Sequence, residues 1–130
     1  MTGVATYSSS LNSLLASMLA RTPGAVHAVL ATVDGVTVAV SAGLPDARAE
    51  QLATIGAGLL SIADGAGIMM STGTPRHVLV EMYGGLLLTA PIAPRVGLTV
   101  LATYDAERER LGFEVAQFAR QIAPLVAHIG

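Results

Sequence analysis

The longest periodic segment of the chain is residues 46–67, where apolar positions recur with the 3.6-residue period of a helix. Large apolar residues dominate one row along this predicted helix: Leu52, Ile55, Leu59, Ile62 and Ala66. Small residues dominate a second row about 100° away: Ala49, Ala53, Gly56, Leu60 and Ala63. We expect the large row to cover the protein's own sheet and the small row to face a partner, so the pattern predicts a chain that associates.

Two glycines lie in the interior of the same predicted helix, at positions 56 and 58. Each of them costs about 0.5–1 kcal/mol relative to alanine. A partner backbone that approaches the small row closely would account for this cost. The glycines at 65 and 67 are expected to end the helix.

The segments before residue 46 predict a helix followed by a hairpin. Apolar residues at helical spacing begin at Leu11, and the run Thr-Pro-Gly at 22–24 ends this first helix. Two β-rich runs follow at 25–33 and 36–41. The Asp34-Gly35 pair between them is typical of a two-residue hairpin turn.

The second half of the chain predicts three strands and a closing helix. Short turns separate the strands at 76–82, 86–92 and 96–103, and a helix starts near Asp105. Pro124 removes a helical hydrogen bond, so we expect it to kink or end this helix. The inward-facing apolar row of the helix is Leu111, Val115, Phe118, Ile122 and Leu125.

The resulting order is helix, two strands, helix, three strands, helix. It predicts an α+β sandwich with a five-stranded, mostly antiparallel sheet. Because strands such as 26–33 are apolar on both sides of their alternation, helices should cover both faces of the sheet. A chain of 130 residues suits one domain. We place it at 11–130 and expect residues 1–10, which are small and polar, to be disordered.

Composition narrows the classes of partner. Only 12% of the residues are charged and 52% are hydrophobic, against a usual charged share of about a quarter, which favours buried subunit interfaces. The apolar runs are interrupted before the roughly 18–20 residues of a membrane-spanning helix, so we expect no direct membrane insertion. The seven basic residues are all scattered arginines, which argues against nucleic-acid binding. No signal peptide is apparent and cysteine is absent, which suits the cytoplasm.

No motif indicates catalysis, and we expect no catalytic residue, metal or cofactor. A phosphate-binding P-loop needs a lysine, which the chain lacks. The histidines at 27, 77 and 128 have no partner at metal-ligand spacing. Glu81 lies in an otherwise apolar strand, and we interpret it as an edge or interface charge paired with an arginine such as Arg76. A catalytic acid at this position would need a second carboxylate opposite it.

Four local motifs, in this order and spacing, resemble the roadblock family, which is named for dynein light chains, and its prokaryotic members in particular. These motifs are Pro23-Gly24-Ala25, Asp34-Gly35, the run from Ala49-Glu50-Gln51-Leu52-Ala53 through Gly58-Leu59-Leu60-Ser61, and Glu81-Met82-Tyr83-Gly84-Gly85. The likeness extends from about residue 11 to residue 128. It implies the element order derived above.

The resemblance also implies a homodimer, or a heterodimer with a related subunit, in which central helices pack together and third strands pair edge to edge. On this reading the dimer interface comprises Ala49, Ala53, Gly56, Leu60, Ala63, His77, Leu79 and Glu81. In such proteins the dimer is a platform for small Ras-like GTPases and acts as a scaffold, regulator or activator. For this chain we expect a non-enzymatic adaptor. Relatives in high-GC bacteria resemble parts of signalling sets that contain a sensor kinase and associate with the membrane through partners. The face expected to contact the GTPase is Arg48, Gln51, Thr54, Gly58 and Ser61.

Two other functions stay open at this point. Related sheet-and-helix folds hold small ligands, although few buried polar residues are available here to orient one. A purely structural, self-assembling module is the other alternative. If the chain accelerates GTP hydrolysis directly, an arginine inserted in trans is the obvious means, and Arg48 is the candidate.

Overall fold

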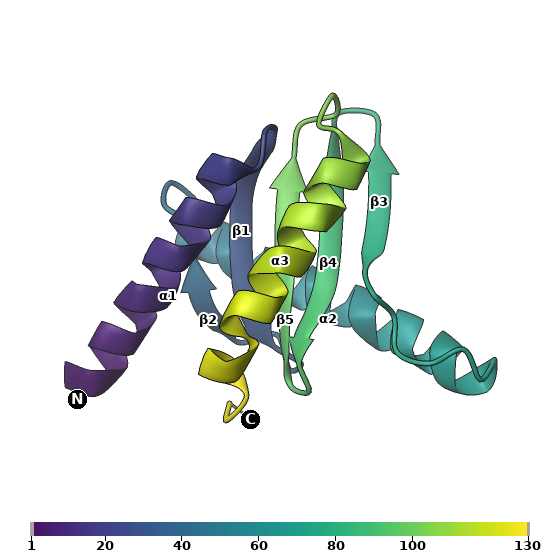
Figure 1. The fold of residues 1–130 in the computed structure, drawn as a ribbon, viewed down its shortest axis with the longest axis horizontal. Coiled ribbons are helices and arrows are strands. Elements are labelled where there is room, and N and C mark those ends of the chain that lie inside the picture. Colours follow the sequence, from purple (N-terminus) through teal and green to yellow (C-terminus); the bar gives the residue numbers. More distant parts are fainter. Residues whose placement is uncertain (1, 130) are drawn as a thin grey trace.

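The computed structural model describes the backbone of residues 2–129 and the side chains from Ser10 to Ile129. Its elements follow the predicted order (Figure 1). They are α1 (Thr2–Arg21), β1 (Ala25–Thr32), β2 (Thr37–Val40), α2 (Asp46–Met69), β3 (Val78–Met82), β4 (Gly85–Ala93), β5 (Val96–Ala102) and α3 (Arg108–Val126).

The five strands form one sheet in the order β2-β1-β5-β4-β3, and every pairing is antiparallel. Helices α1 and α3 lie on one face and α2 crosses the other (Figure 1). The sheet's two faces therefore form two separate cores. Phe118 of α3 and Leu15 of α1 are fully buried in the larger core. Leu52 and Ala53 of α2 belong to the smaller one.

The first helix is longer than expected. The sequence predicted disorder over residues 1–10, whereas α1 begins at Thr2. Met1 lies outside the described residues. The helix continues towards the N-terminus because residues 2–10 contain no proline and only one glycine, Gly3, so nothing in that stretch breaks it.

Helix α2 also continues past its predicted end, to Met69. Gly67 does not end it, because Gly67 is buried against the returning chain: a Cβ there would lie 2.0 Å from the Gly73 carbonyl oxygen. The chain turns back after the helix at Ser71, which has a φ of 57°. Of the described helices, α2 is long and apolar enough to cross a membrane by length and composition alone, a test that core helices of soluble proteins also pass.

The last helix tolerates its proline. Pro124 lies inside α3, which continues to Val126. Val126 is fully buried and Leu125 is half exposed, so the inward row ends at Val126 and not at Leu125 as predicted. The reason is helical spacing, since Val126 follows Ile122 by four residues.

Candidate functional site

Helix α2 packs on its own sheet through the small row. Ala49 and Ala53 are each 1% exposed. Gly56 lies directly over β5, where a Cβ would be 1.9 Å from Thr99 Oγ1. The prediction that these three residues face a partner is therefore wrong. The close approach that the glycine permits is intramolecular, between the α2 backbone and the sheet.

The other two members of the small row are half-buried at the same contact. Leu60 packs over β5, because a Cβ added at Gly97 would lie 2.8 Å from Leu60 Cδ1. Ala63 is half-buried as well. Both residues belong to the flank of α2 that rests on the sheet, so the sheet, and not a partner, accounts for the small side chains here.

The large row is left largely exposed, the reverse of the expectation. Ile55 is 51% exposed and Ile62 is 75% exposed. Only Leu52 is buried, and Leu59 is half-buried against the smaller core. Because Gly56 lies directly over Thr99, Ile55 and Ile62, about 100–120° around the helix from it, lie to the side of the contact and stay exposed. We call Ile55, Leu59 and Ile62 the isoleucine row; Leu59 packs partly on the smaller core, whereas the exposed Ile55 and Ile62 belong to neither core of the described residues.

The residues expected to contact a GTPase lie together on the outward side of α2. Arg48, Gln51, Thr54, Gly58 and Ser61 are all exposed. They follow one another at spacings of three or four residues, so they share a strip of the helix surface. The Thr54 hydroxyl donates a hydrogen bond to the Glu50 carbonyl, and nothing lies within 4 Å of a Cβ built at Gly58. This contact assignment stays a prediction.

The remaining residues assigned to the dimer interface lie on or next to β3, at the edge of the sheet. Glu81 forms an ion pair with Arg108 of α3, and not with Arg76 as the sequence analysis supposed. Leu79 packs against the larger core. A Cβ at Gly112 of α3 would lie 3.8 Å from His77 Cε1. These three side chains therefore lie on the α3 side, and it is the backbone of β3 that stands at the edge.

The two edges of the sheet differ in whether their outward backbone groups have a partner. At β2 the Val40 N–H, which lies on the outer edge, donates a hydrogen bond to Asn12 Oδ1 of α1 at 3.0 Å. Strand β3 pairs with β4 on one side, and within residues 2–129 no strand pairs with it on the other. An unpaired strand edge is a ready template for another strand.

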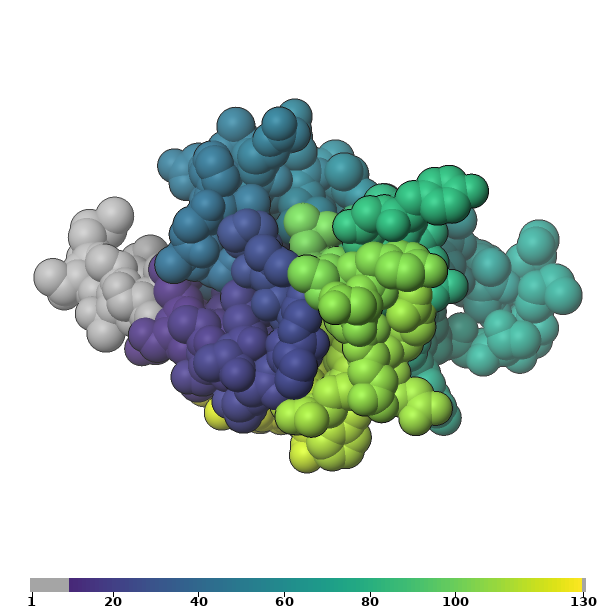
Figure 2. Space-filling model, turned by 90° about the horizontal axis from the view of Figure 1, so that it is seen from above, coloured from purple at the N-terminus to yellow at the C-terminus, as the bar shows by residue number. Residues whose placement is uncertain are grey.

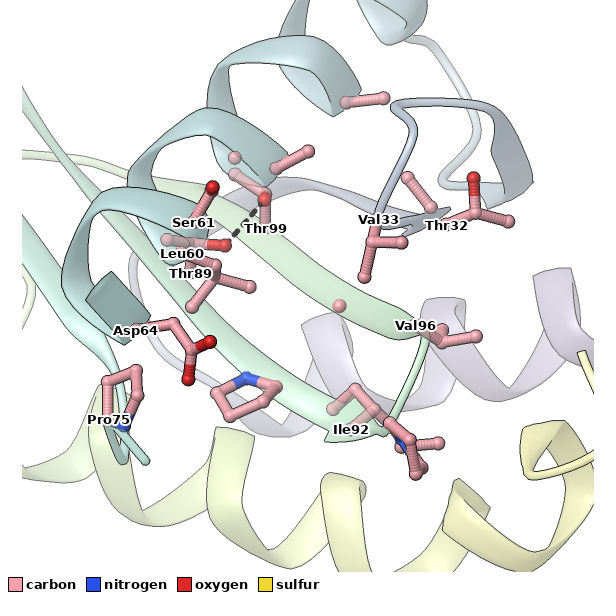
Figure 3. Close-up of a pocket in the computed structure, with 18 of the residues that line it drawn as sticks. Thr32, Val33, Leu60, Ser61, Asp64, Pro75, Thr89, Ile92, Val96 and Thr99 are labelled. Carbon is pink, nitrogen blue, oxygen red and sulfur yellow. Dashed lines mark hydrogen bonds between the residues drawn. The ribbon is translucent and has the colours of Figure 1, made fainter. Parts of the chain in front are cut away.

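A pocket of about 720 Å³ lies beside α2, between its C-terminal half and the ends of β1, β4 and β5 (Figure 3). Leu60, Ser61 and Asp64 of α2 line it on one side, and the Asp64 carboxylate points into it (Figure 3). Thr89 and Thr99 line its floor, with their hydroxyl oxygens 2.9 Å apart. The sequence alone does not predict this pocket, because the residues that line it come from segments far apart in the chain.

The Thr89–Thr99 pair yields a testable prediction. Both residues are at least 96% buried. Thr89→Val or Thr99→Val alone would leave one buried hydroxyl without its partner, so we expect each to lower the free energy of unfolding by about 1–3 kcal/mol. The double variant removes both polar groups at nearly constant volume, and it should be much less destabilised than the sum of the singles. Urea denaturation of the four proteins measures this cycle; additive losses would contradict the pairing.

The chain matches one family model and resembles several solved structures. A model of the Roadblock/LC7 domain matches residues 11–102. The crystal structure of a Roadblock/LC7 domain from Streptomyces avermitilis is similar, with a TM-score of 0.84 and 31% identity over 88% of this chain and 96% of that one. MglB of Myxococcus xanthus has the same fold, with a TM-score of 0.81 and 12% identity over 90% of this chain and 87% of that one. No curated protein matches the chain.

Proposed function

The chain belongs to the Roadblock/LC7 family, and from this premise we propose that it is a non-enzymatic, dimeric adaptor that binds a small Ras-like GTPase. The observation that carries the proposal is the isoleucine row of α2, an apolar surface directed away from the protein's own core. Isolated exposed apolar residues are ordinary, whereas a continuous row on one helix favours an interaction surface. The partner in the dimer is a second copy of the chain or a related subunit.

The open edge of β3 supports a dimer in which two sheets join. Asn12 occupies the outer edge of β2, so β3 is the edge left for strand pairing. A two-fold axis at β3 would pair it with its copy in an antiparallel manner. The joined sheet would then have both α2 helices on the same face.

The projecting C-terminal end of α2 supports the same dimer arrangement. The C-terminal end of α2 projects beyond β3, away from the rest of the molecule (Figures 1 and 2). Ile68, Met69 and Met70 at this end are each at least 66% exposed. Across a two-fold axis at β3, this end would lie over the partner's sheet beside the partner's α2. Flexible methionines suit such an interface because they adapt to irregular surfaces.

The outward strip of α2 is the surface we assign to the GTPase. In the proposed dimer, two copies of Arg48, Gln51, Thr54, Gly58 and Ser61 lie on the exposed side of the helix layer. An adaptor acts by binding one nucleotide state better than the other, which shifts the partner's conformational equilibrium by the difference in binding free energy. Arg48 is exposed and is the candidate if hydrolysis is accelerated in trans. We place the complex in the cytoplasm, with a sensor kinase and membrane association supplied through partners.

The test is affinity capture of the GTPase, run once with GDP and once with a non-hydrolysable GTP analogue. We expect a small GTPase in one nucleotide state. Gly58→Gln should reduce its recovery about tenfold or more, because it places a long side chain on the docking strip, while Ala116→Gln on the exposed side of α3 should not. Equal recovery in both states would indicate a scaffold without switching. Recovery of no GTPase, or unchanged recovery with Gly58→Gln, would contradict the proposal.

A further inference from the structure

We propose that the pocket between α2 and the ends of β1, β4 and β5 binds a small monocationic ligand, a protonated amine on an apolar body that also carries an oxygen acceptor. The volume, about 720 Å³, falls within the roughly 300–1,000 Å³ typical of ligand sites. This inference does not rest on the proposed GTPase adaptor function, although Ser61 belongs both to the pocket lining and to the strip assigned to the GTPase.

The walls of the pocket suit an apolar body. Apolar side chains of α2, the strand ends and the segment after α2 form them: Val33, Leu60, Pro75 and Pro91. The prolines are rigid and lack a backbone N–H, so they add apolar surface without a donor that needs a partner. A ligand between α2 and the strand ends would therefore remove apolar surface from water at little conformational cost.

The charge of the pocket selects a cation. Asp64 is its only charged side chain, and no lysine, arginine or histidine lines it. Within the described residues Asp64 forms no ion pair. A protonated amine would give this carboxylate a charge-assisted hydrogen bond. An anion or a zwitterion would bring a second negative charge into a site that has no positive group to meet it.

The floor supplies a hydrogen-bond donor. Thr89 and Thr99 each carry one hydroxyl proton, and the single contact between their oxygens uses one of the two. Thr89 is fully buried and Thr99 is 4% exposed, so a ligand can reach only the Thr99 hydroxyl, which accepts the Thr89 proton and keeps its own proton free. No other hydrogen bond of either hydroxyl is present in the described part of the chain. An oxygen of the ligand would accept the Thr99 proton. A buried donor without an acceptor is costly, which favours a ligand that carries one.

The pocket leaves the proposed dimer surface free. At about 100° per residue, Ala57, Ser61 and Asp64 fall on one flank of α2 relative to the sheet-facing Gly56. Ile55 and Ile62 fall on the other flank. Ligand binding and dimer formation thus use opposite sides of one helix, and a ligand could be held by the dimer as well as by the single chain.

The test uses phenylalaninamide, which has a protonated amine, an apolar ring and an amide oxygen. We would titrate it into the ¹⁵N-labelled protein and follow amide chemical shifts. Shifts should be confined to residues 57–64, 74–75, 89–97 and 31–33. Phenylalanine, which is a zwitterion, should bind more weakly than phenylalaninamide. Neutral N-acetylphenylalaninamide should also bind more weakly, because it cannot pair with Asp64.

Asp64→Asn should weaken phenylalaninamide binding about fivefold, the upper range for a solvent-exposed ion pair. Asp105→Asn, at an exposed carboxylate outside the pocket, should leave it unchanged. The Thr89→Val/Thr99→Val double variant should weaken binding too, without changing the preference for the cation. Absence of shifts at these residues, equal binding of the three compounds, or unchanged binding to Asp64→Asn would overturn the inference, whatever the outcome of the GTPase capture.

Discussion

Alanine at position 56 is expected to lower the free energy of unfolding by about 1–3 kcal/mol, as overpacking of a well-packed core generally does. The new Cβ would lie 1.9 Å from Thr99 Oγ1 and 3.2 Å from Thr89 Oγ1. Either α2 would have to lift from the sheet or the hydroxyl pair would have to break. The gain in helix propensity, about 0.5–1 kcal/mol, offsets only part of this cost.

Gly58→Ala is the matched control, two residues along the same helix. Nothing lies within 4 Å of a Cβ there, so the propensity gain should appear alone and raise stability by about 0.5–1 kcal/mol. Urea denaturation followed by circular dichroism measures both. Adding Thr89→Val and Thr99→Ala to Gly56→Ala should recover part of the loss, because that change removes both hydroxyls and opens space. If alanine were equally tolerated at 56 and 58, α2 would not lie as close to the sheet as described.

The order of elements could be predicted because each of its signals is local. Asp34-Gly35 marks a turn within its own hairpin, and the helical period of 46–67 is contained in one segment. The side of α2 that faces the sheet is not a local property. It depends on Thr99 and Gly97 of β5, which lie under Gly56 and Leu60. Side-chain size alone predicted that the large apolar row of α2 would cover the sheet. The close contact between α2 and β5 at Gly56 places the small row there instead.

The same reasoning applies to the ion pair of Glu81. The sequence indicated an edge-strand charge that needs an arginine, and the structure has such a pair. Its partner is Arg108, 27 residues away, at the start of α3. Tyr104 places its ring 5.3 Å from the same guanidinium. Nearness in sequence favoured Arg76, but a pairing between a strand and a helix on its face is set by topology.

Ile62→Glu is expected to dissociate the proposed dimer. Ile62 is 75% exposed in the single chain, so a charged side chain there should leave the fold of the subunit intact. In the dimer, two copies of the isoleucine row would face each other, and a carboxylate would be taken out of water without a partner. We expect the dissociation constant to rise roughly thirtyfold or more, the effect of losing a hot-spot residue of at least 2 kcal/mol.

The matched control is Val36→Glu, because Val36 is 61% exposed but lies in the β1–β2 turn, away from the isoleucine row. Sedimentation equilibrium over a range of concentrations would give the dissociation constants of the wild type and both variants. Thermal unfolding of each, extrapolated to low concentration, would show that the subunit fold persists. A wild type that stays monomeric at all concentrations, or an Ile62→Glu variant as dimeric as Val36→Glu, would show that this face of α2 is not the contact between subunits. The apolar row would then need a different occupant, since α2 itself cannot turn the isoleucines inwards while Gly56 lies on Thr99.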